Sequence, residues 1–330
     1  MSARAVRAGT VDACDDRPIG VLVMAHGTPD TPEGIEAFYT AIRRGRPPTP
    51  ELLDELVRRY AAIGGTSPLT ERTRAQVGAL AAALDRAEPG GFEVRFGAKH
   101  VRPTIEEALA GLAGAGVSRV VGIVLTPHQS SLGSQQYFRR AAEAAAAASP
   151  AVELVAIPSW HRDAAFPHLL AERTRAVLHQ LDPAARTRTA LFFTAHSLPE
   201  RAVTADDPYP DQVGESAAEV AGLLGLDSDP TVTWGVAWQS AGRTGDRWIG
   251  PDLLAEIGRV ADGGATAVVV CPVGFVSDHL EILYDLDIEA CDRALAAGVA
   301  FARTPSLNDD PAFVDLLARA VRDAVATGVT

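Results

Sequence analysis

The segment IGVLVMAHGTP (residues 19–29) sets the pattern from which the fold can be inferred. Residues 19–25 form a continuous apolar run, which is typical of a strand buried on both faces of a parallel sheet. Short runs of the same kind, rich in Val, Ile and Phe, recur at residues 94–98, 119–125, 152–157, 189–195, 232–237, 266–271 and 299–302. Strands at all these places would suffice for two four-stranded sheets.

Longer segments rich in Ala, Leu, Arg and Glu separate the apolar runs and predict helices. Thr49 and Pro50 suit the N-cap and first position of one helix, and Thr104 with Glu107 has the spacing of a capping box. We therefore expect helices over residues 49–60, 73–87, 104–113, 136–148 and 217–224. The alternation of strands and helices predicts an α/β doubly wound fold.

The opening pattern occurs a second time in the other half of the chain. Residues 189–199 read TALFFTAHSLP, so both strands end in Ala-His, followed by a small residue, any residue and Pro. A duplicated Rossmann-like half would explain the repeat, and a chance match is the alternative for so short a pattern.

Composition limits the classes of function. The chain of 330 residues is 47% hydrophobic and 22% charged, as in soluble globular proteins, and its net charge of −12 argues against general binding to nucleic acid or an anionic membrane. Residues 1–18 lack the apolar run of a signal peptide, and no stretch approaches the roughly 20 apolar residues that span a bilayer. We expect a cytoplasmic protein.

Several common cofactor motifs are missing from the sequence. The three cysteines, Cys14, Cys271 and Cys291, form no CxxC pair, so there is no zinc-ribbon or simple iron–sulfur pattern. Residues 64–68 form a glycine-rich turn that does not match a Walker A loop, and no GxGxxG follows the first strand. ATP, NAD and FAD are therefore unsupported as cofactors.

Histidines gather where the predicted strands end. Five of the eight follow a strand end by a few residues: His26, His100, His128, His161 and His196. Ligands of open α/β sheets bind outside the carboxyl ends of the strands, so several histidines there indicate a functional edge, although one alone is more often structural. A neutral imidazole can accept a proton or bind a borderline metal, and His196 is a candidate for either role.

The acidic run SDHLEILYDLDIE (residues 277–289) carries the strongest chemical signal. In an α-helix Glu281, Asp285 and Glu289 would share one face, where like charges cost a few tenths of a kcal/mol unless cations visit them. Carboxylate oxygens suit a hydrated divalent ion. A solvated acidic face is the alternative.

Arginines cluster between residues 43 and 59. Five of them lie in this stretch beside three acids, and a guanidinium can grip a carboxylate or phosphate in a fork. For any one arginine the alternative is an ordinary solvated surface position.

Together, several of these segments resemble the ferrochelatase family. In the first half of the chain the likeness lies in residues 21–29, 42–46 and 64–69. In the second half it lies in residues 194–199, 207–212, 238–240, 248–251 and 272–289. The motifs keep their order from residue 20 to residue 324 and look most like the monoderm-bacterial branch, soluble monomers that use coproporphyrin III.

The resemblance implies a chelatase-like architecture: two Rossmann-like domains around a cleft, each with a four-stranded parallel sheet flanked by helices. We expect a flexible N-terminus at residues 1–18, a first domain at 19–157 plus a C-terminal helix at 306–330, and a second domain at 158–305. The implied reaction inserts Fe²⁺ into coproporphyrin III, releases two protons and yields the iron porphyrin of haem biosynthesis.

The resemblance also assigns roles to residues. His196 and Glu281 match the active-site pair, with His196 as proton acceptor and both as metal ligands, and Asp285 and Glu289 match an acidic line that carries the metal inward. Positions that hold propionates or line the macrocycle match Arg43, Arg59, Tyr60, Ser67 and Tyr137.

His26 departs from the family pattern. Close relatives tend to carry a tyrosine there, on the opposite face of the porphyrin, where it can ligate the product iron. Histidine can also ligate haem iron, so we expect His26 to line the porphyrin and to be the axial ligand of product iron. A hydrogen bond within its own loop is the alternative.

The resemblance bears on cofactors and partners as well. Many actinobacterial relatives carry a [2Fe–2S] cluster held by cysteines mostly near the C-terminus, whereas here no cysteine follows Cys291 and three cannot supply four ligands. We expect no cluster, no tightly bound cofactor and a monomer, with a transient contact to the next haem-pathway enzyme left open. The alternatives are a cobalt or nickel chelatase for another tetrapyrrole and a non-catalytic haem-binding protein.

Overall fold

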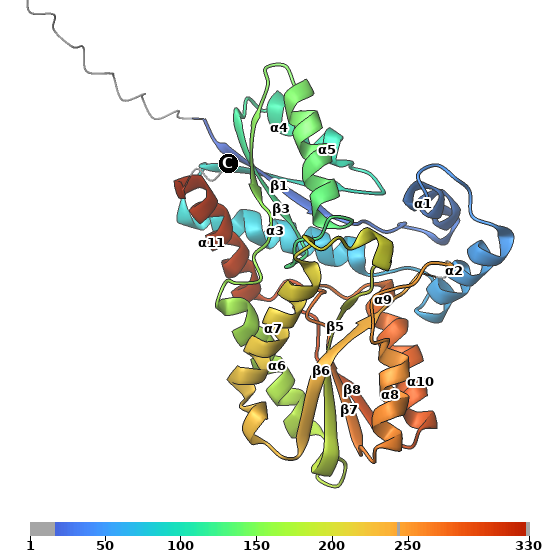
Figure 1. Cartoon of the computed structure of the whole chain (residues 1–330). Helices are drawn as coiled ribbons and strands as arrows, with labels where there is room; N and C mark the ends of the chain where they lie inside the picture. The colour runs from blue at the N-terminus through green and yellow to red at the C-terminus, as the bar shows by residue number, and fades with distance from the viewer. Residues whose placement is uncertain (1–16, 243–244, 328–330) are drawn as a thin grey trace, which may run out of the picture.

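The computed structural model describes residues 17–242 and 245–327. Two α/β units lie one above the other, and α1 (Ile35–Ile42) and α2 (Pro50–Ala62) project from one side of the upper unit (Figure 1). The flexible segment expected at residues 1–18 falls almost wholly outside the described residues. No helix within the described ranges is long and apolar enough to cross a membrane.

The upper unit is built on a four-stranded sheet in which every pairing is parallel. Its strand order is β2-β1-β3-β4, with bounds β1 Ile19–Ala25, β2 Phe92–Ala98, β3 Arg119–Val124 and β4 Glu153–Ile157. Residues 21–24 of β1 are fully buried, because this central strand is covered on both faces. The continuous apolar runs therefore predicted these strands correctly.

The lower unit repeats the arrangement. Its parallel sheet has the order β6-β5-β7-β8, with bounds β5 Thr189–His196, β6 Val232–Gln239, β7 Ala267–Cys271 and β8 Ala300–Arg303. The two orders are equivalent, so β1 and β5 hold the same place in their sheets. The two Ala-His motifs consequently end equivalent strands.

Helices cover both faces of both sheets. The expected helices exist, and both capping-box bonds are present: Glu107 N donates to Thr104 Oγ1 at 3.2 Å and Thr104 N donates to Glu107 Oε2 at 2.9 Å. Pro50 begins α2 as predicted, although the Thr49 side chain makes no capping bond. The remaining bounds are α3 Leu69–Ala87, α4 Ile105–Gly114, α5 Ser134–Ala147, α6 Ala165–Gln180, α7 Tyr209–Leu224, α8 Leu253–Asp262, α9 Leu280–Leu283, α10 Cys291–Ala296 and α11 Pro311–Thr327.

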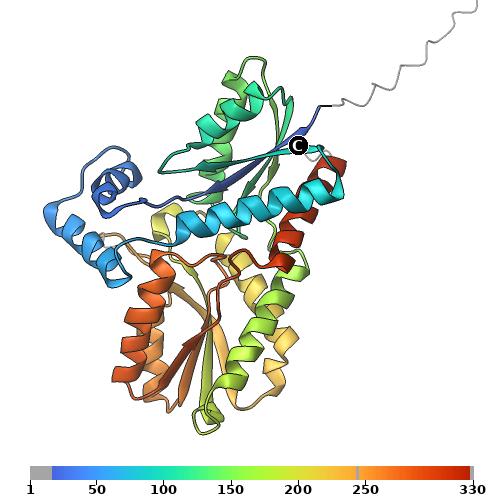
Figure 2. The same cartoon turned by 180° about the vertical axis from the view of Figure 1, so that it is seen from behind.

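One hydrophobic core joins the two units. Val21 and Val23 of β1 face α3 and α11, while Leu191 and Phe193 of β5 face α6 and α7, and all belong to a single buried cluster. Figure 2 shows α3 running along the upper unit and α11 lying across it between the units. The C-terminal helix contacts α3, β3 and β4 but also α6, so it ties the second unit to the first.

The acidic run is not the continuous α-helix that its spacing suggested. After the short α9 the chain forms a π-helical turn over Asp285–Ala290, in which Glu289 N donates to Tyr284 O at 2.9 Å, before α10 begins. Four residues overshoot one turn of an α-helix, whereas they fall short of one wider π turn. The rotation is therefore slightly too large over the α-helical part and slightly too small over the π-helical part. These two deviations cancel, so residues four apart stay on one side of the segment.

Candidate active site

A cleft opens where the carboxyl ends of β1 and β5 face each other. It consists of two adjoining hollows of about 330 and 370 Å³, each within the range of about 300–1,000 Å³ for pockets that hold small molecules. The residues common to both hollows are His26, Leu69, His196, His279 and Glu281. The cleft can therefore take one large ligand that spans both hollows.

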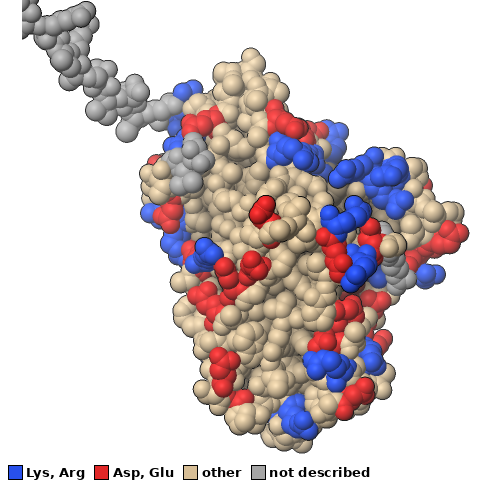
Figure 3. Space-filling view, viewed as in Figure 1, with Lys and Arg blue, Asp and Glu red and all other residues tan. Residues whose placement is uncertain are grey.

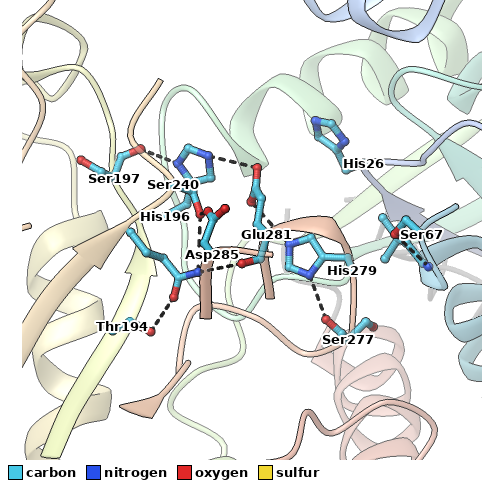
Figure 4. A network of polar contacts seen from close by, with 12 residues as sticks. His26, Ser67, Thr194, His196, Ser197, Ser240, Ser277, His279, Glu281 and Asp285 are labelled. Atoms are coloured by element: carbon cyan, nitrogen blue, oxygen red, sulfur yellow. Dashed lines mark hydrogen bonds and ion pairs between the residues drawn. The ribbon is translucent and has the colours of Figure 1, made fainter. Parts of the chain in front are cut away.

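Glu281 lies between two imidazoles on the second-domain wall of this cleft. The Nε2 atom of His196 is 3.4 Å from Glu281 Oε1, and the Nε2 atom of His279 is 3.4 Å from Glu281 Oε2 (Figure 4). The structure thus brings together the predicted pair, His196 and Glu281. It adds His279, which lay inside the predicted acidic run without an assigned role.

Backbone carbonyls fix both imidazoles. The Nδ1–H group of His196 donates to Ser197 O at 2.5 Å, and that of His279 donates to Ser277 O at 3.0 Å. Because a carbonyl can only accept, Nδ1 carries the proton in each ring, and Nε2 is the atom that faces Glu281. Both rings therefore present the same nitrogen to one carboxylate.

The charges of this group stabilise one another. Burial lowers the pKa of His196, but the nearby charge and contact of Glu281 outweigh it and raise the pKa to about 9. Burial opposes ionisation of Glu281, yet His196 and His279 hold its pKa well below the usual range. Near neutral pH the empty cleft therefore holds a His196–Glu281 ion pair.

Asp285 and Glu289 follow Glu281 along the same segment. They line a separate hollow of about 170 Å³, the outer hollow, together with Arg59, Ser240 and other residues. Ser240 Oγ donates to Asp285 Oδ2 at 2.5 Å, and Arg59 contacts Asp285 at 3.3 Å and Glu289 at 4.0 Å. A hydrated ion can thus meet carboxylates in this hollow before it reaches Glu281 in the cleft.

The pKa of Asp285 is unusually high for a carboxylate beside an arginine. Burial and the charge of Glu281 raise its pKa to about 6, against the opposing effects of Ser240 and Arg59. Its proton is therefore lost within the physiological range.

The Trp-Gln-Ser motif at the end of β6 supports the acidic line, a role that its sequence did not reveal. Gln239 Oε1 accepts from Thr194 Oγ1 at 2.8 Å, and Gln239 Nε2 donates to the backbone oxygen of Glu281 at 3.3 Å. Ser240 has φ +61°, a left-handed conformation that is costly for a residue with a side chain. This backbone places its hydroxyl on Asp285.

His26 stands on the first-domain wall, across from Glu281. Its Nδ1–H group donates to Gly27 O at 3.1 Å, and its ring packs on His100 at 4.6 Å and on Phe38 at 5.7 Å between ring centroids. The imidazole is exposed within the cleft, yet desolvation by the cleft walls still lowers its pKa. Nε2 is consequently left as a neutral electron-pair donor. No interaction in Figure 4 joins His26 to the Glu281 group.

Of the first-domain residues that the family resemblance assigns to porphyrin binding, all except Arg43 line the cleft. Arg59, Tyr60 and Ser67 line one hollow and Tyr137 lines the other. Arg43 lies behind this lining, with its guanidinium 5.8 Å from the ring centre of Tyr39.

Lys99 is a cleft residue that sequence analysis did not single out. Its Nζ atom lies 4.9 Å from the ring centre of Tyr137, and it lines the same hollow. Burial, with the charges of Arg140, Arg44 and Arg139, lowers its pKa to about 8. In Figure 3 the positive side chains gather over α1 and the lower end of α5, beside the cleft.

Two strand-end histidines do not belong to the cleft, contrary to the expectation of a single functional edge. His128 Nε2 bonds Ser216 Oγ at 2.9 Å and His161 Nε2 contacts Glu215 at 3.0 Å, both on α7, in a buried junction between the units. His128 follows β3, which pairs with β1, and His161 follows β4, the edge strand beyond β3. The structural reading is correct for these two.

The acidic and imidazole groups do not form a closed metal centre. Across the part of the chain that the structure describes, no three His, Cys, Asp or Glu side chains are grouped as ligands for a metal ion. Cys271 and Cys291 are free thiols, and Cys14 lies outside the described residues.

Comparison with known proteins shows the family of this chain. The sequence profile of the ferrochelatase family matches residues 18–325. The chain belongs to the ferrochelatase family. A ferrochelatase of Herpetosiphon aurantiacus is 40% identical over 297 residues, which cover 90% of this chain and 96% of that protein. A coproporphyrin III ferrochelatase of a Geobacillus species is 40% identical over 308 residues, which cover 92% of this chain and 97% of that protein.

Solved structures agree on the fold of this ferrochelatase family member. SirB from Bacillus subtilis, determined with Fe³⁺, superposes with a TM-score of 0.56 at 12% identity and covers 94% of this chain and 97% of its own. At that identity the likeness concerns architecture alone, and it confirms the predicted chelatase-like arrangement of two parallel sheets flanked by helices.

Proposed function

We propose that this protein inserts Fe²⁺ into coproporphyrin III to give the iron porphyrin used in haem biosynthesis, with release of two protons. One observation carries the proposal most directly: Glu281 is held between His196 and His279 on one wall of a cleft and faces His26 on the other. Curated relatives at about the same identity and coverage are named for this substrate.

The porphyrin would enter edge-on between the two walls. Its apolar faces suit Leu69, Tyr60 and Tyr137, and its anionic propionates suit Ser67 and the positive groups at the cleft rim. Those positive groups are Lys99 and Arg59, with Arg43 behind the lining beside Tyr39. We infer that coproporphyrin III, with its acidic substituents, is drawn to this rim in spite of the net charge of −12.

The metal would arrive from the opposite direction. Glu289 and Asp285 offer oxygen ligands in the outer hollow, and Glu281 is the last carboxylate before the porphyrin centre. Because these groups do not form a closed centre, they suit an ion that exchanges waters for carboxylates one at a time. These carboxylates would thus transfer Fe²⁺ to the porphyrin and would not store it.

His196 would accept protons only once its ion pair is broken. In the empty cleft Glu281 keeps the imidazole protonated, with a pKa of about 9. A dication at Glu281 would neutralise that carboxylate and repel the imidazolium, so Nε2 would release its proton to water and become a general base that passes each pyrrole proton on to water in turn. Metal arrival thereby prepares the acceptor for the pyrrole protons.

His26 would serve the product on the other face. Its Nδ1–H group is held by Gly27 O, and its lowered pKa leaves Nε2 unprotonated, which are the requirements of an axial iron ligand. We therefore keep His26 as the proposed axial ligand of the product iron.

The remaining expectations form part of the same proposal. We propose a cytoplasmic monomer without a [2Fe–2S] cluster or another tightly bound cofactor, and a transient contact through which the next haem-pathway enzyme receives the product. An iron–sulfur absorbance in purified protein would contradict the cluster-free state.

A matrix of metals and porphyrins tests the proposed activity. Purified protein is mixed with Fe²⁺, Co²⁺ or Zn²⁺ and with coproporphyrin III or protoporphyrin IX, and insertion is followed by absorbance under anaerobic conditions. We expect the highest kcat/KM for Fe²⁺ with coproporphyrin III. Activity with no pair would favour a haem-binding protein, and preference for Co²⁺ would favour a different chelatase.

A further inference from the structure

Arg303, the last residue of β8, binds the acidic segment (residues 277–289) from outside the cleft. Its Nε and Nη2 atoms donate to the two carboxylate oxygens of Asp287 at 2.6 and 2.8 Å, a bidentate geometry that is both strong and directional. Nη2 also donates to Asp278 Oδ1 at 3.3 Å. The side chain is only 15% exposed and is not part of the lining of either hollow of the cleft.

The Asp278 end of this grip is itself firmly anchored. Asp278 accepts from Ser306 Oγ and from Asn308 Nδ2, both at 2.8 Å, and its own N–H donates to Asn308 Oδ1 at 2.9 Å. Gln76 of α3 adds bonds to Ser277 Oγ at 2.9 Å and Asn308 O at 2.8 Å. The start of the acidic segment is therefore tied to the link between β8 and α11.

Most of the groups that face the cleft lie between Asp278 and Asp287, the two carboxylates that Arg303 binds. Asp278 immediately precedes His279, and Asp287 sits inside the π turn between Asp285 and Glu289. The α9 helix is four residues long, too short to hold its own shape. Ile282 and Leu286 are buried beneath this stretch, Gln239, Ser240 and Arg59 hold it on the cleft side, and Arg303 holds it on the other side.

Charge adds a reason for the grip. Residues 278–292 hold six acids and no lysine or arginine, so the segment repels itself. Arg59 relieves this on the cleft side from the first domain, and Arg303 relieves it on the other side from the second. Loss of Arg303 would leave the part-buried Asp278 and the exposed Asp287 without this cation, and the segment would move to separate them.

We propose that Arg303 is a positioning residue for metal insertion. It sets where Glu281 and Asp285 stand relative to the porphyrin centre by holding Asp278 and Asp287, and it contacts neither the porphyrin nor the metal. This inference rests on the proposed function.

The variant Arg303→Met tests it against a matched control. Arg173 binds the same β8–α11 link, through Asp310 at 2.7 Å and Ser306 O at 3.4 Å, and is 20% exposed, but it does not touch the acidic segment. We expect R303M to lower kcat about 10- to 100-fold, the range for lost outer-shell partners of a metal site, and to leave the KM for porphyrin within about twofold. R173M should keep the wild-type kcat.

A conservative change separates position from charge. R303K keeps a cation but cannot bridge both carboxylates in a fork. We expect it to restore the thermal unfolding midpoint and not the kcat. Wild-type kcat in R303M or in R303K, or an equal loss in R173M, would overturn the proposal.

Two further measurements keep the test decisive. If R303M does not fold, Asp287→Leu removes the bidentate part of the same contact, and an unchanged kcat in that variant would also overturn the proposal. Amide hydrogen exchange over residues 279–289 reports position without activity, and we expect it to quicken in R303M and not in R173M. Unchanged exchange overturns the inference even if the wild type inserts no metal, a result that would instead defeat the proposed function.

Discussion

The Nη1 atom of Arg59 donates to Oδ1 of Asp285 at 3.3 Å, although the two residues are 226 positions apart and come from different domains. Both residues line the outer hollow and Arg59 also lines the cleft, so the contact connects the proposed porphyrin side to the acids proposed to carry the metal. It also means that the charge of Arg59 helps to set the protonation of Asp285.

Loss of Arg59 should shift the acidic limb of the pH–rate profile to higher pH. The pKa of Asp285 is raised to about 6, and only its ionised form can take a dication, so kcat/KM for the metal should fall as pH drops through about 6. Arg59→Gln removes a group that lowers this pKa, and the limb should shift to higher pH. Steady-state rates from pH 5 to 8 measure the shift.

The control for that prediction is Arg58→Gln, an exposed arginine one position earlier on α2. It should leave the limb in place. An unmoved limb in R59Q, or an equal shift in R58Q, would argue that Asp285 does not carry the metal.

Stability should depend on pH through His196. Its folded pKa of about 9 exceeds the ordinary 6.5, so its contribution is fully present below pH 6.5 and is lost as pH rises through 9. Glu281→Gln removes the charge that raises this pKa and should flatten the decline. Urea unfolding between pH 6.5 and 9.5 measures both proteins.

The titration of Lys99 changes stability in the same pH range but in the opposite direction. Its pKa is lowered to about 8, so its contribution to stability is smallest at low pH and recovers as pH rises toward 10.5. Both proteins share this effect, and the difference between their curves isolates His196. Parallel curves for wild type and E281Q would refute the ion pair.

The product complex should lose an axial ligand when His26 is removed. We expect the absorbance and resonance Raman spectra of iron-coproporphyrin bound to His26→Ala to show a changed ligand field, because Nε2 of His26 is the neutral donor on that wall. His168→Ala, an exposed histidine of α6, should leave the spectra unaltered. Identical spectra for H26A and wild type would support the loop hydrogen bond as the only role of His26.

A methyl group at Gly274 should disturb the site through packing. A Cβ atom there would lie 2.5 Å from Ala195 Cβ and 2.8 Å from Ala195 Cα, directly before His196. Gly274→Ala should lower the free energy of unfolding by about 1–3 kcal/mol, as overpacked sites do, and reduce kcat. Gly235→Ala, in β6 with open space around the added atom, should do neither, and equal effects would refute this packing argument.

The sequence was sufficient for the parts of the fold that depend on local pattern. Continuous apolar runs such as residues 21–24 predicted strands covered on both faces, and the Thr104–Glu107 spacing predicted a capping box that forms. The repeated Ala-His motif led to His26 and His196, which end equivalent strands. These features follow from a few neighbouring residues, so distant parts of the chain did not need to be known.

The features that sequence analysis missed depend on contacts between distant segments. His128 and His161 looked like His26 by position, but α7 turns them into a buried junction. The π turn contains the buried Leu286 and the Asp287 that Arg303 binds, and both contacts are made with distant parts of the chain. The role of Arg59 toward Asp285 could not be inferred, since the likeness assigned it to the porphyrin alone.

Turnover by Glu281→Gln, measured beside porphyrin binding, tests the central claim most directly. Asp292→Asn, an exposed acid later in the same segment, serves as the control. The account predicts that E281Q inserts Fe²⁺ into coproporphyrin III at least about 100-fold more slowly, while its porphyrin Kd changes less than about threefold and D292N behaves as wild type. Near-normal turnover by E281Q would contradict the assignment of Glu281 as the group that delivers the metal.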